Sequence, residues 1–223
     1  MKSMQSTTRF PGKTVSVASL GQSDCMLAAI QAAIDRGSET RVEVPGSGKI
    51  WIDPKTCQYW QQVGDPHSFF VTPSRRAKAK RAPIPEGRHT SGPLEELLWD
   101  AAFIGSGGQL FEGHQLHDLV ELNWWPNLTR VAHEQSTFSL CAFLSTRPSS
   151  MHLAFRALHV PEDEAFRFYN AALVSGCLKV LKTRSETSAS LSSVGSSEAD
   201  DSKQKRSDVV PFWRRLFAKV SGL

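Results

Sequence analysis

No stretch of the sequence comes near the roughly 18 consecutive apolar residues that a membrane-spanning helix needs. The first residues, MKSMQSTTRFPGK, lack the apolar segment of a secretory signal peptide. The four cysteines are Cys25, Cys57, Cys141 and Cys177, and no two are spaced as C-x-x-C, so neither a zinc ribbon nor a dithiol redox motif is expected. We therefore expect a cytoplasmic protein with free thiols.

A complete nucleotide-binding motif is also missing. The stretch PGSGKI (45–50) ends like a phosphate-binding loop, but Glu43 stands where that motif has its first glycine. Ile50 stands where the motif has the hydroxyl that holds magnesium. The stretch instead predicts a Pro-Gly-Ser-Gly turn (45–48) between two short strands within residues 40–53.

Catalytic and metal-binding patterns are equally sparse. His114 and His117 lie near Asp118, Glu121 and His133, and such side chains can bind a metal. We expect this segment to be extended or turning, with no second group of ligands, which favours structural histidines. No serine or cysteine is recognisably matched with a histidine and an acid. We predict that the protein is not an enzyme and has no cofactor and no metal.

Charge is distributed unevenly along the chain. The net charge is +4, yet residues 92–183 contain ten acidic and six basic residues. A basic cluster lies before them, within a stretch (71–91) that also contains Pro73, Pro83 and Pro85, so we predict an exposed, irregular linker there. Its cations are candidate contacts to an anionic surface such as nucleic acid or acidic lipid. The basic cluster is Arg75, Arg76, Lys78, Lys80 and Arg81.

Helical and strand patterns divide the rest of the chain. Residues 14–20 alternate like a strand, and the apolar spacing of CMLAAIQAAIDRG (25–37) predicts a helix that ends at a glycine. Further on, apolar stripes predict four helices, over 94–103, 137–146, 150–158 and 162–176, and a return strand over 177–181. Helix, short turn, helix and strand in succession are typical of a winged helix-turn-helix.

Residues 94–181 also resemble a known family. The residues that carry the resemblance are Leu98-Trp99, Gly113, Leu116-His117, Trp125-Pro126-Asn127-Leu128-Thr129 and Phe168-Tyr169-Asn170-Ala171-Ala172. This pattern is similar to an uncharacterised proteobacterial protein family with a degenerate winged-helix C-terminal domain. The resemblance implies a fold and brings no activity, ligand or cofactor.

A winged helix raises the question of DNA binding. Its second helix would present Glu162, Asp163 and Glu164 to the phosphates, and DNA affinity depends on lysine and arginine. Sequence-specific reading of DNA by this helix is therefore not expected, and a protein-binding or structural role is favoured.

The stretch NWWPNLTR (123–130) contains two adjacent tryptophans before a proline. In an extended segment, neighbouring side chains point to opposite faces. We predict that Trp125 packs in the core and that Trp124 stays on the surface, where a tryptophan is a typical anchor for a protein partner.

The end of the chain, PFWRRLFAKV (211–220), predicts a basic amphipathic helix. Its apolar face, Phe212, Trp213, Leu216 and Phe217, is a candidate partner-binding surface, and a membrane surface or the protein itself are the alternatives. Two further candidate contacts to an anionic surface are Arg214 and Arg215.

Together these patterns predict an α+β protein, with a small α/β module followed by a mainly helical winged-helix-like domain. We predict a non-enzymatic bacterial adaptor or regulatory protein that acts through protein–protein contacts. The alternatives are a DNA-binding transcriptional regulator and a peripheral membrane-associated accessory protein. The expected order is a flexible lead-in (1–13), the α/β module (14–70), the basic linker (71–91), the winged-helix-like domain (92–183), a disordered serine-rich tether (184–208) and the basic amphipathic helix (209–223).

Overall fold

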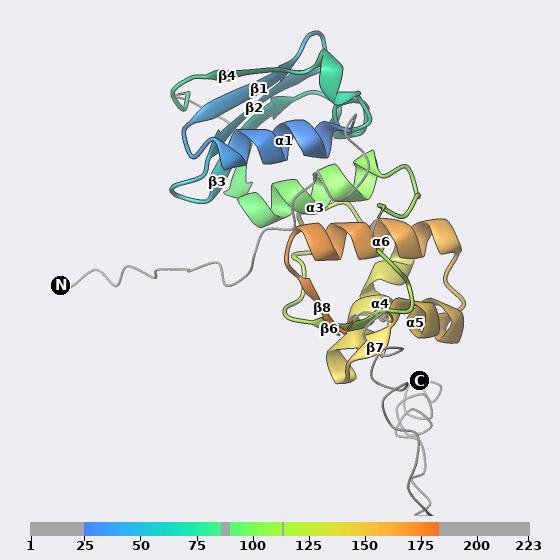
Figure 1. Cartoon of the computed structure of the whole chain (residues 1–223). Helices are drawn as coiled ribbons and strands as arrows, with labels where there is room; N and C mark the ends of the chain where they lie inside the picture. The colour runs from blue at the N-terminus through green and yellow to red at the C-terminus, as the bar shows by residue number, and fades with distance from the viewer. Residues whose placement is uncertain (1–24, 86–89, 113, 183–223) are drawn as a thin grey trace, which may run out of the picture. The chain divides into compact units, whose positions relative to one another are not determined.

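The computed structural model describes residues 25–85, 90–112 and 114–182 (Figure 1). Among these residues it contains six α-helices, a five-stranded antiparallel sheet and a three-stranded antiparallel sheet. The predicted α+β class is thereby confirmed. No helix in the described part is long and apolar enough to cross a membrane. The predicted lead-in (1–13), strand (14–20), tether (184–208) and terminal helix (209–223) lie outside the described residues.

The five-stranded sheet is built around the predicted hairpin. Strands β1 (Thr40–Val44) and β2 (Gly48–Asp53) pair through a turn at residues 45–47, and β3 (Gln58–Val63) pairs with the other side of β2. Gly48 is required where the turn ends, because a Cβ there would lie 2.6 Å from the carbonyl oxygen of Gln62. The glycines of PGSGKI therefore serve a tight hairpin.

Helix α1 (Met26–Asp35) covers one face of this sheet (Figure 1). The helix predicted within residues 25–37 is thus confirmed. Val42 and Ile50 point toward it from adjacent strands and are fully buried. Side chains alternate between the two faces along each strand, so Arg41 and Lys49 lie on the opposite face, together with Trp51.

The stretch predicted as an irregular linker contributes to the same sheet. Strand β4 (Lys78–Arg81) pairs with β1, and β5 (Thr90–Pro93) pairs with β3, giving the order β4-β1-β2-β3-β5. The prediction of irregular structure is wrong for these two segments. Pro73, Pro83 and Pro85 lie outside both strands, and Pro93 ends the edge strand β5, so no ladder hydrogen bond is lost. Two short helices, α2 (Pro66–Phe70) and the 3-10 helix η2 (Ser74–Arg76), precede β4.

Helix α3 (Leu94–Gly105) joins the sheet to the helices that follow. It matches the helix predicted over 94–103, and it packs against α1 as well as against α6 (Glu162–Val174) (Figure 1). Trp99, which is 1% exposed, stacks on Phe103 and meets the edge of Phe168. One hydrophobic core runs through α3, so residues 71–91 do not separate two cores within the described residues.

The remaining elements form a helical layer with a small sheet. The helices predicted over 137–146, 150–158 and 162–176 and the return strand predicted over 177–181 are present. Ser150 caps α5 by accepting a hydrogen bond from the backbone N–H of Leu153. The small sheet has the order β7-β6-β8. The elements are β6 (Leu119–Leu122), α4 (Gln135–Thr146), β7 (Ser149–Ser150), α5 (Met151–Leu158) and β8 (Leu178–Lys182).

Candidate partner-binding site

The loop between β6 and α4, residues 123–134, carries both tryptophans and is here called the WWP loop. The Glu96 side chain on α3 holds it through two hydrogen bonds. Asn127 Nδ2 donates to Glu96 Oε1 at 3.3 Å, and Arg130 Nε donates to Glu96 Oε2 at 2.8 Å. Arg130 also donates to the carbonyl oxygen of Ser91 on β5. The loop is therefore fastened to α3 and to the large sheet.

Two further hydrogen bonds attach the end of the WWP loop to α3. They are made by Asp100, one helical turn beyond Glu96, and by Trp99. The backbone N–H of Ala132 donates to Asp100 Oδ1 at 2.8 Å, and the indole N–H of Trp99 donates to the carbonyl oxygen of Ala132, also at 2.8 Å. Burial raises the pKa of Asp100 to about 6, although the bond from Ala132 opposes this shift. Both polar groups of the Ala132 backbone are thus satisfied by α3 side chains.

Trp124 lies at the other end of the WWP loop and packs over the turn between α6 and β8. A Cβ at Gly176 would lie 3.1 Å from Cη2 of the Trp124 ring. The preceding residue, Asn123, donates its backbone N–H to the carbonyl oxygen of Cys177 at 2.7 Å and its side-chain amide to that of Gly176 at 3.1 Å. Trp124 is nevertheless 41% exposed, which confirms the predicted surface position.

Trp125 is exposed as well, at 42%, so the prediction that it packs in the core is wrong. That prediction assumed an extended segment, but the chain bends at Trp124 immediately after β6 and the two rings do not alternate between inside and outside. The core position is taken by Trp99 instead. Trp125 makes an edge contact with Phe138 of α4, with ring centroids 5.2 Å apart, and Phe138 is itself 61% exposed.

These three exposed rings, Trp124, Trp125 and Phe138, are here called the aromatic surface. Trp125 and Phe138 are in contact, and Trp124 shares with Trp125 the lining of one cavity. Neighbouring exposed apolar side chains of this size often mark a surface that binds a partner. The two tryptophans belong to the WWP loop, whose backbone is held by the bonds to α3, to β5 and to the turn between α6 and β8 described above. The surface therefore combines apolar area with a backbone that is already ordered.

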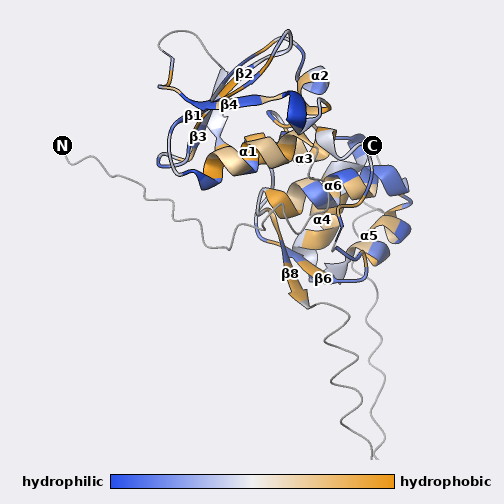
Figure 2. Ribbon diagram, turned by 45° about the horizontal axis from the view of Figure 1, so that its top comes forward, coloured by the Kyte–Doolittle hydropathy of each residue, from blue (hydrophilic) through white to orange (hydrophobic). Residues whose placement is uncertain are grey.

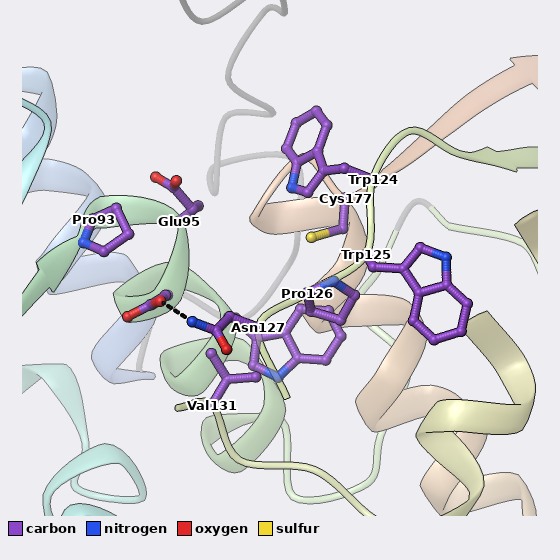
Figure 3. Close-up of a pocket in the computed structure, with 10 residues that line it drawn as sticks. Pro93, Glu95, Trp124, Trp125, Pro126, Asn127, Val131 and Cys177 are labelled. Atoms are coloured by element: carbon purple, nitrogen blue, oxygen red, sulfur yellow. Dashed lines mark hydrogen bonds between the residues drawn. The ribbon is translucent and has the colours of Figure 1, made fainter. Parts of the chain in front are cut away.

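A cavity of about 120 Å³ lies beside the aromatic surface, between the start of α3 and the WWP loop (Figure 3). Figure 3 shows Glu95 on the α3 side and Trp124 on the opposite side, while Trp125 points away toward α4. The residues that line it are Pro93, Glu95, Glu96, Trp99, Trp124, Trp125, Pro126, Asn127, Val131 and Cys177.

The polar groups of this cavity differ in their partners. Both carboxylate oxygens of Glu96 accept hydrogen bonds from the WWP loop, whereas Glu95 is partly exposed and makes no hydrogen bond or ion pair within the described part of the chain. Burial raises the pKa of the Cys177 thiol to about 11, and hydrogen bonds with Ser175 and Trp124 offset part of the shift. The thiol is therefore protonated at neutral pH and is a poor nucleophile.

The basic cluster lies elsewhere, on ordered structure. Arg75 and Arg76 are exposed on η2, and the other three cations are exposed on the edge strand β4. In the register with β1, Lys78 lies opposite Glu43 and Lys80 lies opposite Arg41. The structure thus brings these cations together at one edge of the large sheet, away from the residues that line the cavity.

The histidines that were considered as metal ligands contact other rings. His117 stacks on His152 at a centroid distance of 4.5 Å, and His114 meets the edge of Tyr169 at 6.0 Å. In the described ranges, no group of three or more His, Cys, Asp or Glu side chains is arranged to hold a metal ion. The predicted contact residues Phe212, Trp213, Leu216, Phe217, Arg214 and Arg215 lie outside the described residues.

Comparison of the chain with protein-family models, curated proteins and solved structures finds no match. The resemblance to a proteobacterial family therefore stays a prediction.

Sequence reasoning did not identify several residues of the site. Glu96 and Asp100 are spaced i, i+4 on α3, a spacing that places two acids on the same side of a helix. That spacing was the only local signal for an attached loop. Phe138 and Cys177 gave no signal, because each meets a tryptophan that is distant in the sequence.

Proposed function

We propose that this protein is a non-enzymatic adaptor or regulator of the cytoplasm that binds a protein partner through its aromatic surface. The observation that carries the proposal is the clustering of three exposed aromatic rings, Trp124, Trp125 and Phe138, beside a cavity. Burying the exposed part of each ring at an interface is favourable, because it removes apolar surface from water. Three together are enough to form the centre of an interface, where tryptophan is enriched.

The fixed WWP loop supports the same conclusion. Binding has to offset the entropy lost when loops and side chains become ordered, and a loop that is already ordered loses less. Glu96, Asp100 and Trp99 fasten the loop through their side chains. The partner would therefore meet a surface whose backbone is already in place.

We further propose that α4, α5, α6 and the small sheet form a degenerate winged helix with a role in protein binding. Three helices followed by strand β8 support this reading. The first turn of α6 contains Glu162, Asp163 and Glu164, and the Glu164 carboxylate accepts a hydrogen bond from Ser136. Acids at this position oppose the approach of a phosphate backbone. Phe212, Trp213, Leu216 and Phe217 remain a second proposed contact, argued from the sequence alone.

A second candidate function is the binding of nucleic acid. The observation that favours it is the position of the basic cluster, five exposed cations at one edge of the large sheet. Phosphate contacts by such side chains give affinity without sequence preference.

The first proposal is tested by comparing what is captured from a lysate of the source organism. The bait is the full chain, either unchanged or with Trp125→Ser and Phe138→Ser together. The control bait carries Val71→Ser, which removes an exposed apolar side chain outside α4, α5, α6 and the small sheet. We expect a protein that the unchanged and control baits retain and the double variant loses. Equal capture by all three baits would contradict the proposal.

A further inference from the structure

The described residues that line the cavity beside the aromatic surface include acids and no base. Of the ten residues that line it, two are glutamates and none is basic. Glu96 is already paired with Arg130 at 2.8 Å. Glu95 is not paired with any described residue, and its carboxylate lines the cavity together with the tryptophans.

The apolar part of the cavity suits the same kind of ligand. Trp99, Trp124 and Trp125 contribute to its walls, and Trp124 is 41% exposed although its ring also packs over Gly176. The face of an indole ring carries negative electrostatic potential and attracts a cation that lies over it. Indole and carboxylate therefore favour a positively charged group.

A guanidinium group matches these walls better than an ammonium group. It is planar, so it can lie flat on an indole, and it can donate two parallel hydrogen bonds to a carboxylate. A guanidinium group is also more weakly hydrated than an ammonium group. Its transfer from water into a cavity of about 120 Å³ is therefore less unfavourable.

We infer that this cavity binds an arginine side chain of the protein partner, with the guanidinium on Trp124 and paired with Glu95. The inference rests on the proposed function, since it names the chemistry of the partner segment at that site. The aromatic surface then packs against apolar residues of the partner, and Glu95 selects a segment that contains arginine.

The test uses the full chain labelled with 15N and N-acetyl-arginine amide as the probe. The indole N–H signals of the six tryptophans are followed during titration, and the Trp124 signal is assigned with a Trp124→Phe variant. Two matched probes are N-acetyl-citrulline amide, a neutral compound of nearly the same shape, and N-acetyl-lysine amide.

We expect arginine amide to shift the Trp124 signal in a saturable way and citrulline amide to leave it unmoved at the same concentrations. Lysine amide should bind more weakly than arginine amide. Glu95→Gln should weaken the arginine complex on the order of tenfold, as for loss of a charge-assisted pair beside an indole. Glu112→Gln, which removes an exposed acid that does not line the cavity, should leave the affinity unchanged.

Equal shifts with arginine and citrulline amides, or an unmoved Trp124 signal, would overturn the inference. Lysine amide binding as tightly as arginine amide would overturn the choice of guanidinium. The capture experiment distinguishes this failure from that of the proposed function. If the double variant loses a partner while arginine amide does not bind, the aromatic surface retains its role and only the arginine assignment falls.

Discussion

The ring of Trp124 lies so close over Gly176 that a Cβ at residue 176 would be 3.1 Å from its Cη2 atom. Gly176 also has a φ of +81°, a conformation that L-residues other than glycine rarely adopt. One glycine therefore both ends the turn after α6 and makes room for an aromatic ring of the proposed binding surface.

Gly176→Ala should consequently alter stability and the position of Trp124 together. We expect the free energy of unfolding to fall by about 1–2 kcal/mol, measured by urea titration, because alanine is strained at positive φ and presses on the indole. Gly37→Ala is the matched control, since Gly37 has a φ of +64° but would have nothing within 4 Å of its Cβ. Both variants should lose stability, and only Gly176→Ala should shift the indole signal of Trp124. An unmoved signal would show that the contact does not position the ring.

Glu96→Gln should loosen the WWP loop. Asn127 and Arg130 donate to different oxygens of this carboxylate. An amide has only one acceptor oxygen, so in the variant one of the two donors would face an NH2 group, and the charge that pairs with Arg130 would be lost. We expect a loss of about 1–3 kcal/mol in the free energy of unfolding. Glu95→Gln is the neighbouring control and should change stability little, because Glu95 makes no hydrogen bond in the described residues. Equal effects of the two substitutions would contradict the role assigned to Glu96.

The sequence predicted the helices well because their signals are local. The apolar spacing of residues 94–103 and 162–176 depends only on which helix face is buried, and both helices form where expected. Strand β4 was missed because its residues, Lys-Ala-Lys-Arg, show no apolar alternation. β4 is an edge strand, and it is held in the sheet by backbone hydrogen bonds to β1. The pattern of side chains along the sequence does not indicate such bonds.

The candidate site was predictable only in part for a related reason. Trp124 was recognised as a surface residue, but the position of Trp125 depends on a bend that Asn123 helps to fix through bonds to residues 176 and 177. Those partners lie more than fifty residues away in the sequence. Alternation arguments apply within a regular strand, and the strand β6 ends at Leu122, just before both tryptophans.

Asp100 should make stability depend on pH in mildly acidic conditions. Its pKa is raised from its usual value near 3.8 to about 6 by burial, so the folded state retains a proton that the unfolded state releases. Stability should therefore fall as pH rises from about 4 to 6, and it should be constant in this respect above and below that window. Between these two pH values the free energy of unfolding of the unchanged protein should fall by about 1–3 kcal/mol more than that of Asp100→Asn. Urea titrations at several pH values measure this difference, and parallel profiles for the two proteins would contradict it.

The basic cluster has two explanations that one set of variants can separate. Lysines on an exposed edge strand hinder edge-to-edge pairing with another sheet, and cations in one place also attract phosphates. Replacing all five residues with glutamine should abolish any binding to duplex DNA, which we expect to be weak, independent of sequence and lost as salt rises. The double variant Lys78→Gln, Lys80→Gln should release about two fewer counterions on binding DNA. This number comes from the slope of log affinity against log salt concentration, measured by fluorescence anisotropy. If instead these two substitutions leave DNA binding unchanged and cause self-association in the ultracentrifuge, edge protection explains the cluster.

Tight binding to one DNA sequence that survives about 0.2 M salt would favour a transcriptional regulator, because nonspecific phosphate contacts weaken steeply over that range.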